Sequence, residues 1–144
     1  PLTQRTLPRV LELYAARHGD RHFATLPGAD LTFAAAPLLA ARAAGMFESL
    51  GLQKTECVAL LLSNRVEFIA SVWGQAWRGA VSAPLNPALK GPALLHALKA
   101  CGAKALVVEA DKLEDVTAVA DDAPMLTHII VAGERPAFSR HHSW

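Results

Sequence analysis

From residue 56 onward, short apolar runs alternate with helical patterns, and this alternation restricts the fold more than any other feature. Four runs predict β-strands, at residues 57–62, 80–85, 105–108 and 128–131. The first run is apolar at every position, which is typical of a strand covered on both faces of its sheet. Strands that alternate with helices form right-handed βαβ units, so these strands should lie parallel. The expected fold is α/β, with a mostly parallel sheet of about four strands flanked by helices.

The segment between the first two strands predicts a helix, because its apolar residues recur at helical spacing. Asn64 is a candidate cap, and Glu67 three residues later completes the pattern of a capping box. Gly79 is placed to end this helix. The stripe expected to face inward consists of Ile69, Val72, Trp73 and Ala76.

Two further helices are predicted between the later strands. One opens at Gly91-Pro92 and stops at Gly102, and the other is a short acidic helix over residues 111–121. Apolar periodicity ends near residue 134, so we expect residues 134–144 to be a linker or a truncated loop. The inward positions of the first of these helices are Leu94, Leu95, Leu98 and Cys101.

Before residue 56, the sequence predicts two helices with a β-hairpin between them. The first helix begins at Thr6 and stops near residues 18–20. Two β-type runs, 23–26 and 31–33, flank a Pro-Gly turn and predict the hairpin. The second helix covers residues 34–50, with its proline in the first turn. The two apolar stripes are Leu7, Val10, Leu11 and Tyr14, and then Leu39, Ala43, Met46, Phe47 and Leu50.

The composition excludes several classes of protein. Among the 144 residues, 52% are hydrophobic and 19% are charged, so the chain is not disordered. Its 28 alanines and 21 leucines favour packed helices over an all-β sandwich. A net charge of +1 provides no basic field for nucleic acid. The apolar runs are far shorter than the ~20 residues of a membrane-spanning helix.

The two cysteines, Cys57 and Cys101, lie in apolar runs and belong to no CxxC pair or spaced Cys/His set. This pattern favours buried reduced thiols over a zinc site or a disulfide. Reduced thiols, together with the lack of a visible signal-peptide pattern, predict a cytoplasmic location. The chain starts at Pro1 without a methionine and ends on a polar stretch, so we expect a piece of a larger protein.

Local chemistry predicts no active site. Doubly wound sheets bind ligands at the carboxyl ends of their strands, but no GxGxxG or GxxxxGK[ST] motif occurs in the chain. The helix start beside Arg65 could hold an anion, although a solvated cap with a surface arginine is the favoured interpretation. His96 has no partner at helical spacing, which favours a hydrogen-bonded, partly buried histidine. Trp73 and Trp77 could line a ligand cavity or a partner surface, but packing is favoured.

Several segments, taken in order, carry a family resemblance: 31–33, 50–52, 58–68, 77–81, 84–87, 94–98 and 101–108. The set resembles the N-terminal part of AMP-forming acyl-CoA synthetases, a superfamily that includes luciferases and adenylation domains, and it covers about residues 6–133. Segments 64–68 and 94–96 are most similar to the fatty acid transport protein or very-long-chain acyl-CoA synthetase branch. The chain departs from the family at Ala35 and Pro37, where an acidic residue and a leucine are usual.

The resemblance implies that residues 1–133 are the N-terminal subdomain of a fatty acyl-CoA ligase of lipid metabolism. Such an enzyme uses ATP and Mg²⁺ to convert a long-chain fatty acid into an acyl-adenylate, and then transfers the acyl group to CoA. The family's phosphate loop, Tyr-Gly-x-Thr-Glu segment, ribose-binding aspartate and C-terminal lysine match no position here. No catalytic, cofactor-binding or metal residue is therefore carried over, and the fragment alone should bind none of these groups and be inactive. Asn86, Pro87 and Trp73 are the residues expected near substrate.

Two alternatives remain open at this point. The parent protein could be an adenylate-forming ligase for a non-fatty carboxylic acid, or the chain could be a non-catalytic α/β interaction module that uses Trp73 and Trp77. A free-standing nucleotide-binding domain is disfavoured by the missing phosphate loop. A fragment of a larger enzyme should also bare an apolar face and self-associate. The parent could in addition associate peripherally with a membrane.

Overall fold

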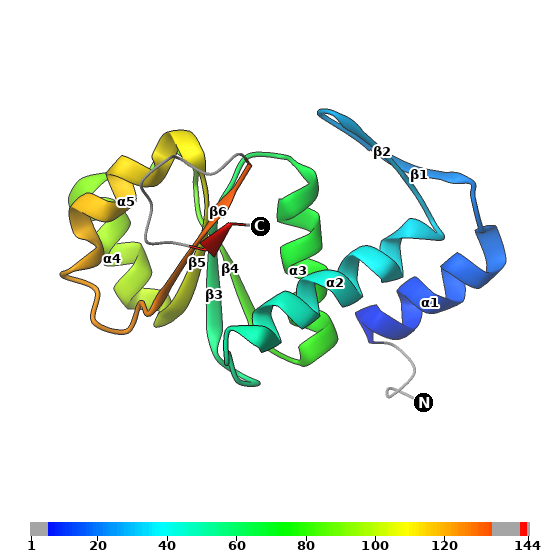
Figure 1. Cartoon of the computed structure of the whole chain (residues 1–144), viewed down its shortest axis with the longest axis horizontal. Helices are drawn as coiled ribbons and strands as arrows, with labels where there is room; N and C mark the ends of the chain where they lie inside the picture. The colour runs from blue at the N-terminus through cyan, green and yellow to red at the C-terminus, as the bar shows by residue number, and fades with distance from the viewer. Residues whose placement is uncertain (1–5, 134–141, 144) are drawn as a thin grey trace.

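The sheet predicted from the sequence is present in the computed structural model, which describes residues 6–133 and 142–143 (Figure 1). The spatial order of its strands is β4-β3-β5-β6-β7, and every neighbouring pair is parallel. Strands β3, β4, β5 and β6 confirm the four predicted runs. The two-residue β7 lies in the segment expected to be a linker, whose other residues, 134–141 and 144, lie outside the described residues. The strands are β3 (Cys57–Leu61), β4 (Val81–Pro84), β5 (Ala103–Glu109), β6 (His128–Ala132) and β7 (His142–Ser143).

Helices cover both faces of the sheet, as the right-handed crossover rule requires. One face carries α2 (Ala35–Ser49) and α3 (Val66–Arg78), and the other carries α4 (Gly91–Cys101) and α5 (Leu113–Ala120) (Figure 1). A short 3₁₀ turn, η2 (Ala110–Lys112), leads into α5. The architecture is therefore the expected α/β arrangement of a parallel sheet between two helical layers.

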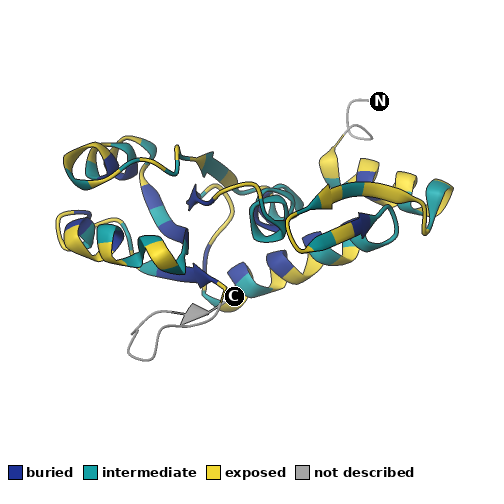
Figure 2. Ribbon diagram, turned by 90° about the horizontal axis from the view of Figure 1, so that it is seen from above, coloured by how far each residue is buried: buried dark blue, intermediate teal, exposed yellow. Residues whose placement is uncertain are grey.

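The strands are buried on both sides because successive side chains point to opposite faces. On β3, Val58 and Leu60 pack toward α2 and α3, whereas Ala59 and Leu61 pack toward α4 and α5. The inner strands are accordingly drawn as buried in Figure 2. Leu60 and Leu61 are fully inaccessible, and burial of a leucine side chain contributes about 1.5–3 kcal/mol. This two-sided burial accounts for the uninterrupted apolar run in the sequence.

The face that α3 buries differs from the predicted stripe by one helical position. Ala70, Ser71, Gly74 and Gln75 are buried, whereas the predicted stripe is only half-buried. The cause is a close approach to α2. A Cβ atom added at Gly74 would lie 2.6 Å from the Cβ of Ala43 and 2.9 Å from the backbone nitrogen of Ala44. Small side chains are therefore required on the face that touches α2.

The N-terminal unit extends away from the sheet, as Figure 1 shows. It consists of α1 (Leu7–His18) and a separate antiparallel hairpin formed by β1 (His22–Leu26) and β2 (Ala29–Thr32), which confirms the predicted helix and hairpin. Within α1 only Leu11 is buried, and it packs with Ala36 and Ala40 of α2. The rest of the predicted α1 stripe remains more than a third exposed: Leu7, Val10 and Tyr14.

We expect Gly74→Ala to lower the free energy of unfolding by about 1–3 kcal/mol, because the new methyl group meets the α2 backbone rather than a flexible side chain. Urea denaturation measures this change. The matched control is Gly45→Ala on the exposed side of α2, where an added Cβ has nothing within 4 Å. It should raise stability by about 0.5–1 kcal/mol, because alanine is the better helix former. Equal stability of the two variants would contradict the close packing of α2 and α3.

Candidate functional site

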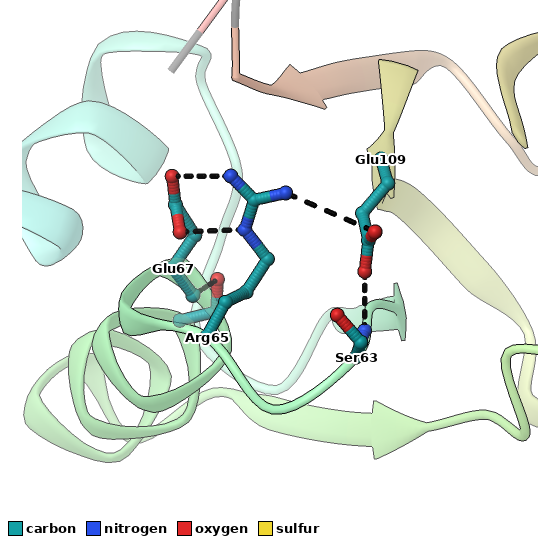
Figure 3. A network of polar contacts seen from close by, with 5 residues as sticks. Ser63, Arg65, Glu67 and Glu109 are labelled. Atoms are coloured by element: carbon teal, nitrogen blue, oxygen red, sulfur yellow. Dashed lines mark hydrogen bonds and ion pairs between the residues drawn. The ribbon is translucent and has the colours of Figure 1, made fainter. Parts of the chain in front are cut away.

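The order of the strands reverses between β3 and β5. The chain runs from β3 to β4 on one side and then crosses to β5 on the other side of β3. In open α/β sheets, ligands bind outside the carboxyl ends of the strands at such a switch point. Ser63 and Arg65 follow β3 there, and Glu109 ends β5 (Figure 3). This edge is the candidate site that the topology selects.

An ionic network occupies the edge. The guanidinium of Arg65 donates two hydrogen bonds to the carboxylate of Glu67, from Nε to Oε2 at 2.7 Å and from Nη2 to Oε1 at 3.0 Å. Its Nη1 lies 3.9 Å from Oε2 of Glu109, and Glu109 Oε1 accepts the backbone N–H of Ser63 (Figure 3). The side chains of Arg65, Glu67 and Glu109 are 27%, 19% and 16% exposed, so solvent screens them only in part.

The two carboxylates are held in their charged forms. Burial is the largest single influence and would raise the pKa of Glu67, but the hydrogen bond from Arg65, a backbone hydrogen bond and the charge of Arg65 together outweigh it, and the net pKa lies below that of an ordinary glutamate. Burial likewise opposes ionisation of Glu109, but its bonds to Ser63 and the charge of Arg65 lower its pKa. Arg65 therefore carries one positive charge between two negative ones.

This pairing corrects three expectations from the sequence. Arg65 is neither a free anion-binding group nor a solvated surface arginine, because carboxylates flank its guanidinium on both sides. The capping box at Asn64 and Glu67 is not formed. The helix begins at Val66, and its N-cap residue, Arg65, makes no side-chain cap bond. Glu67 instead binds the Arg65 guanidinium, since a charge-assisted bidentate bond is stronger than a neutral cap.

A surface hollow of about 390 Å³ lies beside the network. Residues 27–29 of the hairpin turn line one part of it, and residues 63–67 line the other. The hairpin, the sheet edge and the start of α3 therefore meet at one place. Sequence reasoning missed this meeting because the hairpin is far from β3 along the chain and no local pattern reports their proximity.

The predicted substrate-proximal residues occupy two separate places. Asn86 and Pro87 lie in the turn between β4 and α4, where Asn86 is exposed and its side-chain oxygen accepts the N–H of Ala88 at 2.9 Å. Trp73 lies on α3, which covers the opposite face of the sheet from α4. The structure thus does not bring Trp73 together with the turn, and the approach of these residues to a substrate stays a prediction.

The two tryptophans take part in packing between the N-terminal unit and α3. Trp73 and Trp77 pack against the cluster of Leu11, Ala36 and Ala40, and the Trp73 ring meets Phe23 edge-on at a centroid distance of 5.6 Å. These contacts match the packing interpretation. His96, by contrast, is exposed, so the expected partly buried histidine is wrong. Leu94 and Leu98 take the buried face of α4, and His96 lies outside that face.

The described residues show neither a metal-binding cluster nor a membrane-spanning helix. Across residues 6–133 and 142–143, no cluster of three His, Cys, Asp or Glu side chains could hold a metal ion. Among the helices of the same ranges, none is long and apolar enough to span a bilayer.

The family model for AMP-binding enzymes matches residues 11–142. The chain belongs to this family. The resemblance stated from the sequence is thus confirmed.

Curated relatives of this chain include CoA ligases and a transport protein. 4-Coumarate–CoA ligase 1 of Petroselinum crispum is 32% identical over 67% of this chain and 20% of its own length. A long-chain-fatty-acid–CoA ligase of Mycobacterium tuberculosis, FadD13, is 35% identical over 62% of this chain and 18% of its own length. The human long-chain fatty acid transport protein 6 is 36% identical over 72% of this chain and 17% of its own length. The chain spans about a fifth of the length of these relatives.

A solved structure shows the same fold. The anthranilate CoA ligase AuaEII in complex with anthranoyl-AMP has a TM-score of 0.89 and 28% identity. The match covers 96% of this chain and 26% of that chain. Almost all of the present chain therefore superimposes on one part of a larger ligase.

We expect Arg65→Gln to lower the free energy of unfolding by about 1–3 kcal/mol at pH 7, because two carboxylates lose their partner. Since the pKa values of Glu67 and Glu109 are depressed in the folded protein, their contribution is present above the ordinary carboxyl range. This contribution to stability is lost as the pH falls through the folded-state pKa values of the two carboxylates, which lie below the ordinary value of about 4.3. The difference between wild type and variant should therefore shrink between pH 7 and pH 3, as measured by urea denaturation.

Arg42→Gln is the matched control, because Arg42 is exposed and no ion pair to it is found among the described residues. It should change stability by less than about 0.5 kcal/mol at either pH. If Arg65→Gln lowers the free energy of unfolding by the same amount at pH 7 and at pH 3, the ionic network adds no stability.

Proposed function

We propose that the protein containing this chain is an AMP-forming acyl-CoA ligase, and that residues 1–133 form the N-terminal subdomain of its large domain. The observation that carries the proposal is the family match over residues 11–142, joined to relatives that are CoA ligases. Because the chain spans only about a fifth of those relatives, the activity belongs to the larger protein. In this proposal residues 134–144 connect the subdomain to the rest of the enzyme.

The proposed reaction has two steps. A carboxylate attacks the α-phosphorus of ATP, so that an acyl-adenylate forms and pyrophosphate leaves; the thiol of CoA then displaces AMP. Mg²⁺ would neutralise phosphate charge in the first step. At the switch point the residues do not fit ATP, because its cation, Arg65, is already paired, and no three-ligand metal cluster for Mg²⁺ is found among the described residues. We therefore assign no step of the chemistry to this chain.

The contribution we propose for this chain is positional. Arg65 and Glu109 hold the carboxyl ends of β3 and β5 together, next to the hollow that the hairpin turn also lines. Asn86 and Pro87 would approach the substrate side from the end of β4, where Asn86 is exposed. Trp73 would approach the substrate from its position where α3 packs against the N-terminal unit. The alternative of an interaction module built on Trp73 and Trp77 is weakened, because both rings pack within the chain.

For the substrate, we propose a long-chain fatty acid. Support comes from the resemblance of segments 64–68 and 94–96 to the fatty acid transport branch and from the 36% identity to a relative named for long-chain fatty acid transport. An aromatic acid is the second candidate, because the 4-coumarate ligase is 32% identical. We also propose a cytoplasmic location, supported by the free thiols of Cys57 and Cys101, with peripheral membrane contact of the parent enzyme.

The isolated 144-residue chain should show no ATP–pyrophosphate exchange with palmitate or 4-coumarate, and no heat of ATP binding in calorimetry. The physical reason is that the cation at the switch point, Arg65, is already paired with two carboxylates. The isolated chain should also self-associate in sedimentation experiments, because α1 exposes the apolar side chains of Leu7, Val10 and Tyr14. ATP–pyrophosphate exchange by the isolated chain would place catalytic groups within it and would overturn the proposed positional role.

The protein encoded by the complete gene should release pyrophosphate from ATP in the presence of a carboxylic acid and form an acyl-CoA. A panel of palmitate, 4-coumarate, indoleacetate and anthranilate, compared by kcat/KM, separates the two substrate candidates. We expect palmitate to exceed each aromatic acid by about tenfold or more, which corresponds to about 1.4 kcal/mol of differential transition-state binding. Preference for an aromatic acid would reject the fatty acid assignment but keep the ligase class.

A further inference from the structure

The two cysteines of the chain meet at the amino edge of the sheet, opposite to the ionic network. Cys57 is the first residue of β3, and Cys101 is the last residue of α4. Because β3 and β5 are parallel neighbours, Cys57 lies opposite Ala103, only two residues after Cys101. Gly102, with a φ of 61°, supplies the left-handed turn between α4 and β5. Strand pairing thus places two distant cysteines side by side.

The two thiols are neighbours. Cys101 lies close enough to Cys57 to affect its pKa, and the Sγ of Cys101 lies 3.5 Å from the carbonyl oxygen of Leu98. Cys57 is buried, with 8% of its surface exposed, whereas Cys101 is partly accessible. Burial raises the pKa of the Cys57 thiol to about 11, and the neighbouring Cys101 adds to this. Cys57 is therefore protonated and shielded, and Cys101 is the thiol that a reagent meets.

We propose that Cys57 and Cys101 form a dithiol site that reacts with low-molecular-weight disulfides and closes into an intramolecular Cys57–Cys101 disulfide. The sequence favoured two unrelated buried thiols, because the two residues are far apart along the chain. Their proximity in the fold changes that expectation. Two sulfur ligands without a third donor do not make a zinc site, and the described residues supply no such third group.

The reaction balances in two exchange steps. First, the Cys101 thiolate attacks one sulfur of the small disulfide; the S–S bond breaks, a mixed disulfide forms, and one thiol leaves with the proton that Cys101 gave up. Second, Cys57 releases its proton to water and its thiolate attacks Cys101 Sγ, so that the second small thiol leaves and takes up a proton. Both protein thiols are oxidised, and the small disulfide is reduced to two thiols.

The placement of the two residues favours the second step. The pairing of β3 with β5 keeps Cys57 beside Cys101, whose sulfur it attacks, so we expect closure rather than a long-lived mixed disulfide.

The test uses the 144-residue chain and oxidised glutathione, followed by intact mass and peptide mapping without reduction. Wild type should lose two hydrogens and yield a peptide pair linked through Cys57 and Cys101. Cys57→Ser should instead retain one glutathione on Cys101. Cys101→Ser should react at least about tenfold more slowly than wild type, because the remaining thiol is shielded, and in urea this difference should vanish.

Circular dichroism checks that each variant is folded, and Cys57→Ala replaces Cys57→Ser if the hydroxyl is not tolerated in the core. A stable glutathione adduct on wild type, or disulfide-linked dimers in place of the internal link, would overturn the proposal. Equal rates for folded Cys101→Ser and wild type would do so as well, since Cys57 would then be the accessible thiol.

Discussion

Burial of β3 on both faces is the constraint on which the rest of this structure depends. A strand with apolar side chains on both sides needs a helical layer above and another below. Val58 and Leu60 draw α2 and α3 onto one face, while Ala59 and Leu61 draw α4 and α5 onto the other. Because the connections are right-handed, the same burial puts β4 and β5 on either side of β3 and creates the switch point.

The elements could be predicted because each leaves a local signal. Apolar runs revealed the strands, and helical spacing with glycine stops revealed α2, α3 and α4. The face of α3 could not be predicted in the same way, because its burial is decided by backbone contact with α2 at Gly74 and not by hydrophobicity. Hydrophobic periodicity predicts that the most apolar face of a helix is buried, whereas close packing of two helices buries the face with the smallest side chains.

The candidate site exposed a different limit. Asn64 and Glu67 have the spacing of a capping box, yet Glu67 binds Arg65, because an ion pair with two aligned hydrogen bonds competes better for the carboxylate. Glu109 and Cys101 each act with a partner brought close by strand pairing, to which no local spacing points. The long-range partners of polar side chains therefore could not be predicted from the sequence. The family could, because an ordered set of motifs along the chain identifies it.

The contact between α2 and α3 also has a mechanical consequence. Where most helix pairs are separated by long side chains that can rearrange, here the methyl group of Ala43 and the backbone of Ala44 lie against Gly74. The interface therefore lacks a compliant layer. Because α1 and the hairpin pack onto these two helices, the N-terminal unit is joined to the sheet through a contact that has little room to rearrange.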